Sequence, residues 1–214
     1  MLCFLATDFN IDRNLLQYAL KTAVDKSFNR ITIDGDTSTN DMVICLANGV
    51  AGNDRVQTKN QAYKTFQETL DQVTLSLAHL IVRDGEGVTK FVEIRVTGAA
   101  TTKDARAIAR SLANSLLVKT AFFGEDPNWG RFMMAIGKAG ARVNSERINI
   151  ALDGLTIVQQ GVEIQEAWEE KAKEVLRKTE IKVIVDLNLG SAETVVWTTD
   201  LSQDYVRLNS QYLT

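Results

Sequence analysis

Two periodic segments near the middle of the chain constrain its fold most. Residues 60–82 place apolar side chains at every third or fourth position, which is the spacing of one face of a helix. The apolar positions of this segment are Tyr63, Phe66, Leu70, Val73, Leu77 and Leu80. Residues 88–98 (VTKFVEIRVTG) then alternate along the chain, which is typical of a strand whose two faces meet different surroundings. The fold must therefore accommodate a long helix followed directly by a strand.

The rest of the chain continues this mixture. Helices are predicted at 12–28 with Asp12 as N-cap, at 101–118 with Thr101 or Thr102 as N-cap, at 128–137 after Asp126 and Pro127, and at 166–178. Strands are predicted around Ile31 and Ile33, at 42–47, 148–152 and 155–158, and at 181–189 and 193–199, the last two joined near Gly190. Because helices and strands do not alternate strictly, we expect α+β or mixed α/β layers rather than a doubly wound sheet.

Composition excludes several classes of protein. The 214 residues are 45% hydrophobic and 24% charged, as in ordinary soluble globular proteins. A net charge of −3 disfavours a nucleic-acid binder, and no apolar run approaches the roughly 18 residues of a membrane span. The start, MLCFLATD, lacks the positive region of a signal peptide, so a cytoplasmic protein is expected. Cys3 and Cys45 lie in apolar stretches without a CxxC pattern, which favours buried thiols over a zinc site.

Few residues offer chemistry of their own. His79 is the single histidine and lies off the apolar stripe of its helix, so we expect it on the surface and expect no Ser–His–Asp mechanism. The polar segment 34–41 favours a turn, and it lacks the glycine and glutamate positions of an EF-hand loop, so no metal site is predicted. Arg131 could bind a carboxylate or form a surface ion pair.

Glu86 lies between two glycines in the segment DGEG. Flanking glycines let the backbone adopt unusual angles and let a ligand approach closely, and a carboxylate there could pair with a substrate ammonium group. The segment could equally be a helix C-cap and turn with an exposed glutamate. From the residues alone, both interpretations remain open.

Four long motifs resemble one enzyme family, and together they follow its order over nearly the whole chain. They are SFNRITIDGDTSTNDMVICLANG (27–49), DGEGVTKFVEIRVTGA (84–99), FFGEDPNWGRFMMAIGKAGA (122–141) and DYVRLNSQYLT (204–214). The chain resembles the β chain of the bifunctional ornithine acetyltransferase and glutamate N-acetyltransferase family of arginine biosynthesis.

The resemblance implies a self-cleaving precursor and a threonine nucleophile. Cleavage frees the N-terminal threonine of the β chain, which takes the acetyl group of N-acetylornithine and passes it to glutamate through an acetyl-threonine intermediate. The α-amine of such a threonine can act as its base, so no histidine is required. The nucleophile is then expected immediately before Met1, and no residue of 1–214 is assigned a catalytic role. No cofactor is implied, although acetyl-CoA is a substrate of bifunctional members.

The resemblance also implies binding residues, partners and a fold. Glu86, Asn209 and Thr214 match the substrate-binding positions of the family. Residues 1–214 would form one β chain, assembled with an α chain into an α2β2 heterotetramer, and the α chain would supply the oxyanion hole. The implied fold is a mixed α/β sandwich that resembles N-terminal-nucleophile hydrolases but differs in topology. Two alternatives are a self-processing amidohydrolase, in which water replaces glutamate as acceptor, and a non-catalytic subunit.

Overall fold

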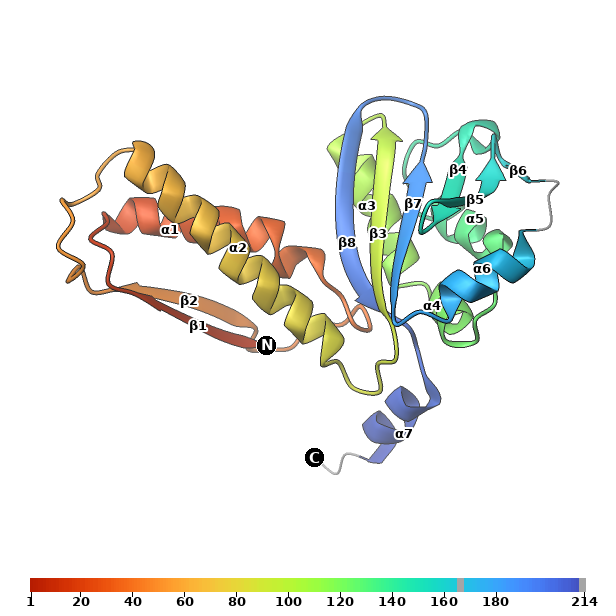
Figure 1. Ribbon diagram of the computed structural model, residues 1–214, viewed down its shortest axis with the longest axis horizontal. Helices are drawn as coiled ribbons and strands as arrows, with labels where there is room; N and C mark the ends of the chain where they lie inside the picture. The colour runs from red at the N-terminus through yellow and green to blue at the C-terminus, as the bar shows by residue number, and fades with distance from the viewer. Residues whose placement is uncertain (165–167, 212–214) are drawn as a thin grey trace. The chain divides into compact units, whose positions relative to one another are not determined.

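The computed structural model describes residues 1–164 and 168–211 and confirms a mixed α/β fold (Figure 1). The chain forms two compact units. Unit 1 comprises Met1–Ile31 and Asp36–Leu80, and unit 2 comprises Thr32–Gly35 and the chain from Ile81 onward. Within the described residues, no helix has both the length and the apolar character that crossing a membrane requires.

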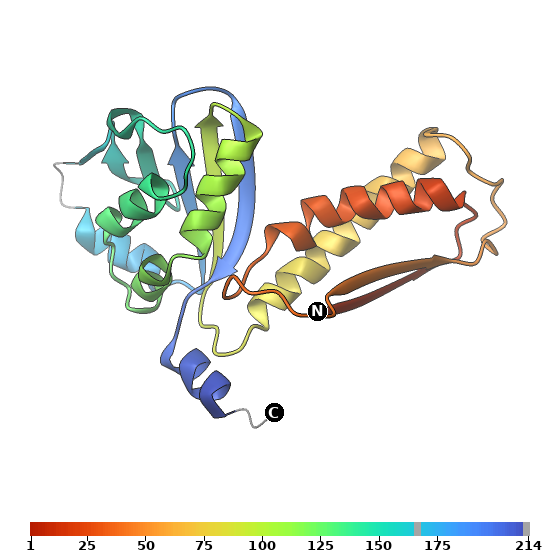
Figure 2. The ribbon, with the colours of Figure 1, turned by 180° about the vertical axis from the view of Figure 1, so that it is seen from behind.

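Unit 1 is a pair of parallel strands covered by two helices. Its elements are β1 (Leu2–Thr7), α1 (Arg13–Lys26), a 3-10 helix (Phe28–Arg30), β2 (Met42–Ala47) and α2 (Gln61–Arg83), whose last three residues belong to unit 2. The strands pair in register from Leu2 opposite Met42 to Thr7 opposite Ala47. Parallel strands need a long crossover, and α1 lies in it. In Figures 1 and 2, both helices lie along the same side of the strand pair.

The core of unit 1 explains where the helical predictions succeed and fail. Asp12 caps α1 by accepting from the Asn14 N–H at 2.9 Å, as predicted. The predicted helix at 60–82 is α2, and Leu70 on its apolar face is buried against α1, whereas Val73 and Leu80 on that face are exposed. His79 is half-buried rather than on the surface as predicted.

Unit 2 is built on a mixed sheet. Its strands are β3 (Phe91–Ala99), β4 (Asn149–Leu152), β5 (Leu155–Gln159), β6 (Val162–Glu163), β7 (Glu180–Asp186) and β8 (Ala192–Thr199). Its helices are α3 (Thr102–Ala113), α4 (Leu116–Phe123), α5 (Trp129–Gly137), α6 (Glu169–Leu176) and α7 (Gln203–Gln211), with a 3-10 turn at Ser145–Arg147. In the described residues the strand order is β6-β5-β4-β7-β3-β8. Figure 2 shows α3 and α5 over the same face of this sheet.

Strand β3 is the centre of the core of unit 2. Val92, Ile94 and Val96 are fully buried and pack in one cluster with the apolar side of α3, including Ile108 and Leu112. Each such side chain contributes about 2 kcal/mol by leaving water. The strand predicted from the alternation within 88–98 is therefore confirmed as β3.

Several predicted elements have other bounds in the structure, and β7, for example, ends at Asp186 rather than at residue 189. The predicted helix 101–118 is two helices, because Ser115 starts α4 as an N-cap that accepts from the Val118 N–H. The strand predicted around Ile31 and Ile33 is absent from the described elements, because Ile31 forms only a β-bridge and residues 33–35 are bends. The N-cap of α5 is Asn128 rather than Asp126, and it makes no side-chain capping hydrogen bond. Glu166, the predicted start of the charged helix, lies outside the described residues, and α6 begins at Glu169.

Candidate functional site

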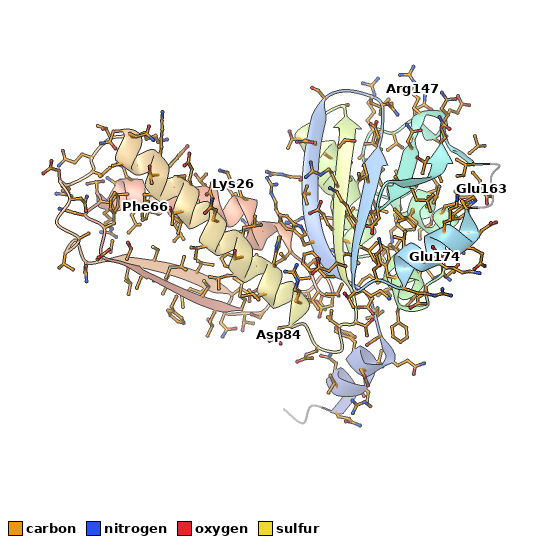
Figure 3. The ribbon with its side chains drawn as sticks, in the orientation of Figure 1. Lys26, Phe66, Asp84, Arg147, Glu163 and Glu174 are labelled. Atoms are coloured by element: carbon orange, nitrogen blue, oxygen red, sulfur yellow. The ribbon has the colours of Figure 1, made fainter. Side chains whose placement is uncertain are left out.

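The candidate site is built around the loop 84–90, between the end of α2 and the start of β3. Asp84, labelled in Figure 3, marks the point where α2 has ended. Gly87 has φ of +65°, in the left-handed region that residues with a Cβ rarely adopt. A Cβ at Gly87 would also collide with the backbone nitrogen of Tyr205 and lie 2.9 Å from the Ser202 hydroxyl. Glycine therefore allows the loop to approach the segment before α7 closely.

Asp200 holds the end of this loop. Its carboxylate accepts from the Thr89 N–H at 3.0 Å, the Thr89 hydroxyl at 2.6 Å and the Lys90 N–H at 3.0 Å. Asp200 is buried directly after β8, so the three bonds fix the loop to the end of that strand. Hydrogen bonds to a charged acceptor of this kind are worth roughly 1.5–3 kcal/mol each.

Helix α7 docks on the other side of the loop. The buried Ser202 hydroxyl donates to the Gly87 carbonyl at 2.6 Å and accepts from the Tyr205 N–H at 3.1 Å. The Tyr205 hydroxyl donates to Oδ2 of Asp34 at 2.8 Å. These bonds hold the first turn of α7 at both the loop and the segment 32–35.

This docking brings two of the predicted binding residues together. Asn209 Nδ2 donates to Oε2 of Glu86 at 3.0 Å and to the Tyr205 carbonyl at 3.0 Å. Both side chains are exposed, so a small molecule can reach the carboxylate. An amide donor orients a carboxylate without neutralising it, which leaves a fixed negative charge for a ligand ammonium group. Thr214, the third predicted binding residue, lies outside the described residues.

Lys119 is a further buried charged residue that the sequence reasoning missed. It lies in α4 with 1% of its surface exposed. Its ammonium group donates to the Thr199 carbonyl at 2.5 Å, the Thr199 hydroxyl at 2.9 Å and the Thr198 hydroxyl at 3.3 Å. The available signal was a lysine inside the apolar run LLVKTAFF, since lysine is rarely fully buried without partners.

Burial lowers the pKa of Lys119 from its usual 10.5 to about 8, and the carboxylates of Asp200 and Asp34 oppose this shift. The unfolded chain keeps the proton up to its ordinary pKa, so between about pH 8 and 10.5 it binds more protons than the folded chain, and stability rises with pH. From about pH 7.5 to 10 this effect contributes about 2 kcal/mol. We expect the melting-temperature advantage of the wild-type protein over Lys119→Met to widen across this range. An equal difference in melting temperature between the two proteins at about pH 7.5 and about pH 10 would contradict the lowered pKa of Lys119.

The other sequence candidates have structural roles in the described residues. Ser38 donates to Asp41 through its hydroxyl at 2.7 Å and its N–H at 3.1 Å, which supports the predicted turn. No three metal-ligating side chains gather anywhere in the described parts of the chain. Arg131 donates to the Leu117 carbonyl at 2.9 Å and pairs with Asp126 at 3.5 Å, so it links α5 to α4 and forms an ion pair, which was one of its two predicted roles.

Comparisons with known proteins agree with this architecture. The ArgJ family profile matches residues 1–214. The chain is 48% identical over 214 residues to the "Arginine biosynthesis bifunctional protein ArgJ" of Geobacter sulfurreducens, covering all of this chain and 54% of that protein. It is 46% identical over 221 residues to the "Glutamate N-acetyltransferase" of Methanocaldococcus jannaschii, again covering all of this chain and 54% of that protein.

A solved structure extends the likeness to three dimensions. The crystal structure of the arginine biosynthesis bifunctional protein argJ from Bacillus halodurans superposes with a TM-score of 0.93 at 43% identity, covering 99% of this chain and 100% of that chain. The chain spans about half the length of the curated relatives it matches. The matches confirm the resemblance carried by the four motifs. The chain belongs to the ArgJ family.

Proposed function

We propose that this chain is the β part of an acyltransferase that moves the acetyl group of N-acetylornithine to glutamate in arginine biosynthesis. The observation that carries the proposal is the 3.0 Å contact between Asn209 and Glu86, which pairs two residues 123 positions apart at an exposed surface. Membership of the ArgJ family and the names of the relatives support a role in arginine biosynthesis and acetyl transfer to glutamate. N-acetylornithine as the donor follows from the family resemblance.

In this proposal Glu86 binds an ammonium group of the amino-acid substrate. The α-nitrogen of N-acetylornithine is an uncharged amide, so the side-chain ammonium group is the cation that this donor offers. A carboxylate held by an amide gives such a group a charge-assisted hydrogen bond with a defined direction. Asn209 keeps the carboxylate in place, and Thr214 completes the binding set.

The nucleophile in this proposal is a threonine that precedes Met1 and is freed by cleavage of the precursor. Its own amine removes the proton of its hydroxyl as that oxygen attacks the acetyl carbonyl. Ornithine leaves, and the α-amine of glutamate then takes the acetyl group from the threonine oxygen. The oxyanion donors come from the α chain.

The partner in this proposal is the α chain of the same precursor, in an α2β2 assembly. Leu2, Phe4 and Leu46 lie on one face of the β1–β2 pair and are 56%, 66% and 65% exposed. Side chains alternate along strands, so this face points away from the buried Cys3 side. Exposed apolar patches of this kind mark interaction surfaces, and in this proposal the α chain buries this patch.

An assay of the full-length gene product with N-acetylornithine and glutamate tests the reaction. We expect ornithine and N-acetylglutamate in equal amounts. Acetate in place of N-acetylglutamate would instead indicate the amidohydrolase, and no turnover would indicate a non-catalytic subunit. Replacing N-acetylornithine with acetyl-CoA tests the second donor, which the family resemblance implies for bifunctional members.

A further inference from the structure

We infer that Lys119 is a positioning residue for the Glu86–Asn209 pair, acting through the end of β8 on the loop 84–90 and through Asp34 on α7. The inference rests on the proposed function for its kinetic consequence. Its structural consequence, which is how firmly α7 and the loop are held, does not depend on that function.

Lys119 contacts the end of β8. All three hydrogen bonds of its ammonium group go to Thr198 and Thr199. Thr198 is held independently, because its hydroxyl donates to the Ala113 carbonyl at 3.1 Å. A buried charge with three hydrogen bonds to one strand end fixes that end relative to α4, because any shift leaves the charge without its partners.

Asp200 connects this strand end to the loop 84–90. Asp200 directly follows Thr199, and its carboxylate holds Thr89 and Lys90 by three hydrogen bonds. Glu86 lies three residues before Thr89, within the same short loop. The position of Glu86 therefore depends on where Asp200 is held, and Lys119 holds the residue next to it.

The same strand end is also linked to α7, through the segment 32–35. The Thr199 hydroxyl, which Lys119 holds, also donates to the Ile33 carbonyl at 3.5 Å, next to Asp34. The positive charge of Lys119 attracts the Asp34 carboxylate, which accepts from the Tyr205 hydroxyl at 2.8 Å. Tyr205 lies one helical turn before Asn209 and accepts the Asn209 amide on its carbonyl. Both members of the pair are thus tied to one buried ammonium group.

Hydrogen–deuterium exchange on the assembled full-length enzyme tests the structural part. We expect Lys119→Met and Tyr205→Phe to speed amide exchange in α7 by roughly tenfold. Lys119→Met is also expected to speed exchange in loop 84–90. Two control variants lose the same kinds of group in unit 1. Lys26→Met removes an ammonium that donates to Asp71, and Tyr63→Phe removes a hydroxyl that donates to Gln67. Both controls should leave exchange in α7 at the wild-type rate.

Steady-state kinetics on the same variants test the positioning role. Because the pair binds substrate and does not react, we expect the KM for N-acetylornithine to rise roughly tenfold in Tyr205→Phe and Lys119→Met, with kcat within about threefold of wild type. The controls should keep the wild-type KM. A general loss of folded enzyme would lower the apparent kcat and leave KM unchanged, so the two effects are distinguishable.

Unchanged exchange in α7 for Tyr205→Phe would overturn the inference, as would equal effects in the test and control variants. If Lys119→Met does not fold, Thr199→Val takes its place with the same expected results, because it removes the hydroxyl that accepts from Lys119 and donates to the Ile33 carbonyl. Faster exchange with an unchanged KM, in an enzyme that Glu86→Gln impairs, would also overturn it. If Glu86→Gln is kinetically silent, the proposed function has failed, and the exchange rates alone decide the role of Lys119.

Discussion

Gly87→Ala is expected to lower kcat/KM for N-acetylornithine by at least about a hundredfold while the sheet of unit 2 stays folded. A Cβ at this position would collide with the backbone nitrogen of Tyr205 and lie 2.9 Å from the carbonyl carbon of Asp204. Backbone atoms at the start of a helix cannot rotate away as a side chain can, so α7 must shift as a body. A displacement of about 1 Å at a binding group can cost about a hundredfold in rate.

Gly140→Ala is the matched control for this variant. Gly140 has φ of +67° against +65° for Gly87, but a Cβ there would meet nothing within 4 Å. Both variants carry the same penalty for a left-handed residue, roughly 1–2 kcal/mol, and Gly87→Ala alone adds the collision. Melting temperatures and kinetics of the two enzymes separate these effects. Equal activity in both would show that the close approach of α7 to the loop has no role in the reaction.

Glu86→Gln is expected to lower kcat/KM for N-acetylornithine by more than about tenfold without unfolding the protein. Glutamine has the same shape and can still accept the Asn209 amide, so the variant removes the charge and keeps the contact. Losing one member of a hydrogen-bonded charge pair in a bound complex costs about 2–5 kcal/mol. The measurement is the kinetics of acetyl transfer to glutamate at saturating acceptor, alongside a thermal unfolding curve.

Glu174→Gln serves as the control for charge. Glu174 is an exposed glutamate of α6, labelled in Figure 3, and its loss changes the net charge by the same amount. It should leave the kinetics within about twofold, because exposed charges away from a site contribute little. Unchanged kinetics in Glu86→Gln would return Glu86 to a structural role in the turn after α2.

The candidate site was predictable only through the family resemblance. From the residues alone, Glu86 between its glycines was equally consistent with a turn, because a local pattern does not show what faces it. The match to the family singled out Glu86 and Asn209, and the structure places them 3.0 Å apart. Neither the local sequence pattern nor the family resemblance identified Lys119, because its hydrogen-bond partners Thr198 and Thr199 lie about eighty residues away in the sequence.

Apolar periodicity alone also did not show where one helix ends and the next begins, or which apolar residues are buried. Ser115 divides the predicted helix 101–118 because its hydroxyl satisfies a backbone N–H that a continuous helix would bond to a carbonyl. Val73 and Leu80 fit the helical stripe of α2 but are exposed within this chain. Periodicity reports which residues share a face and leaves open what covers that face.

Most of the helices and strands follow from local sequence, because capping residues and apolar periodicity act within a few residues. Asp12 is the N-cap of α1, and the alternating segment 88–98 contains β3, both as predicted. Which strands pair with one another depends on tertiary contacts. The strands expected to be joined near Gly190, β7 and β8, do not pair, because β3 lies between them, parallel to one and antiparallel to the other. Strand partners depend on which arrangement buries the apolar faces of the whole sheet, and that choice is not encoded in any local window.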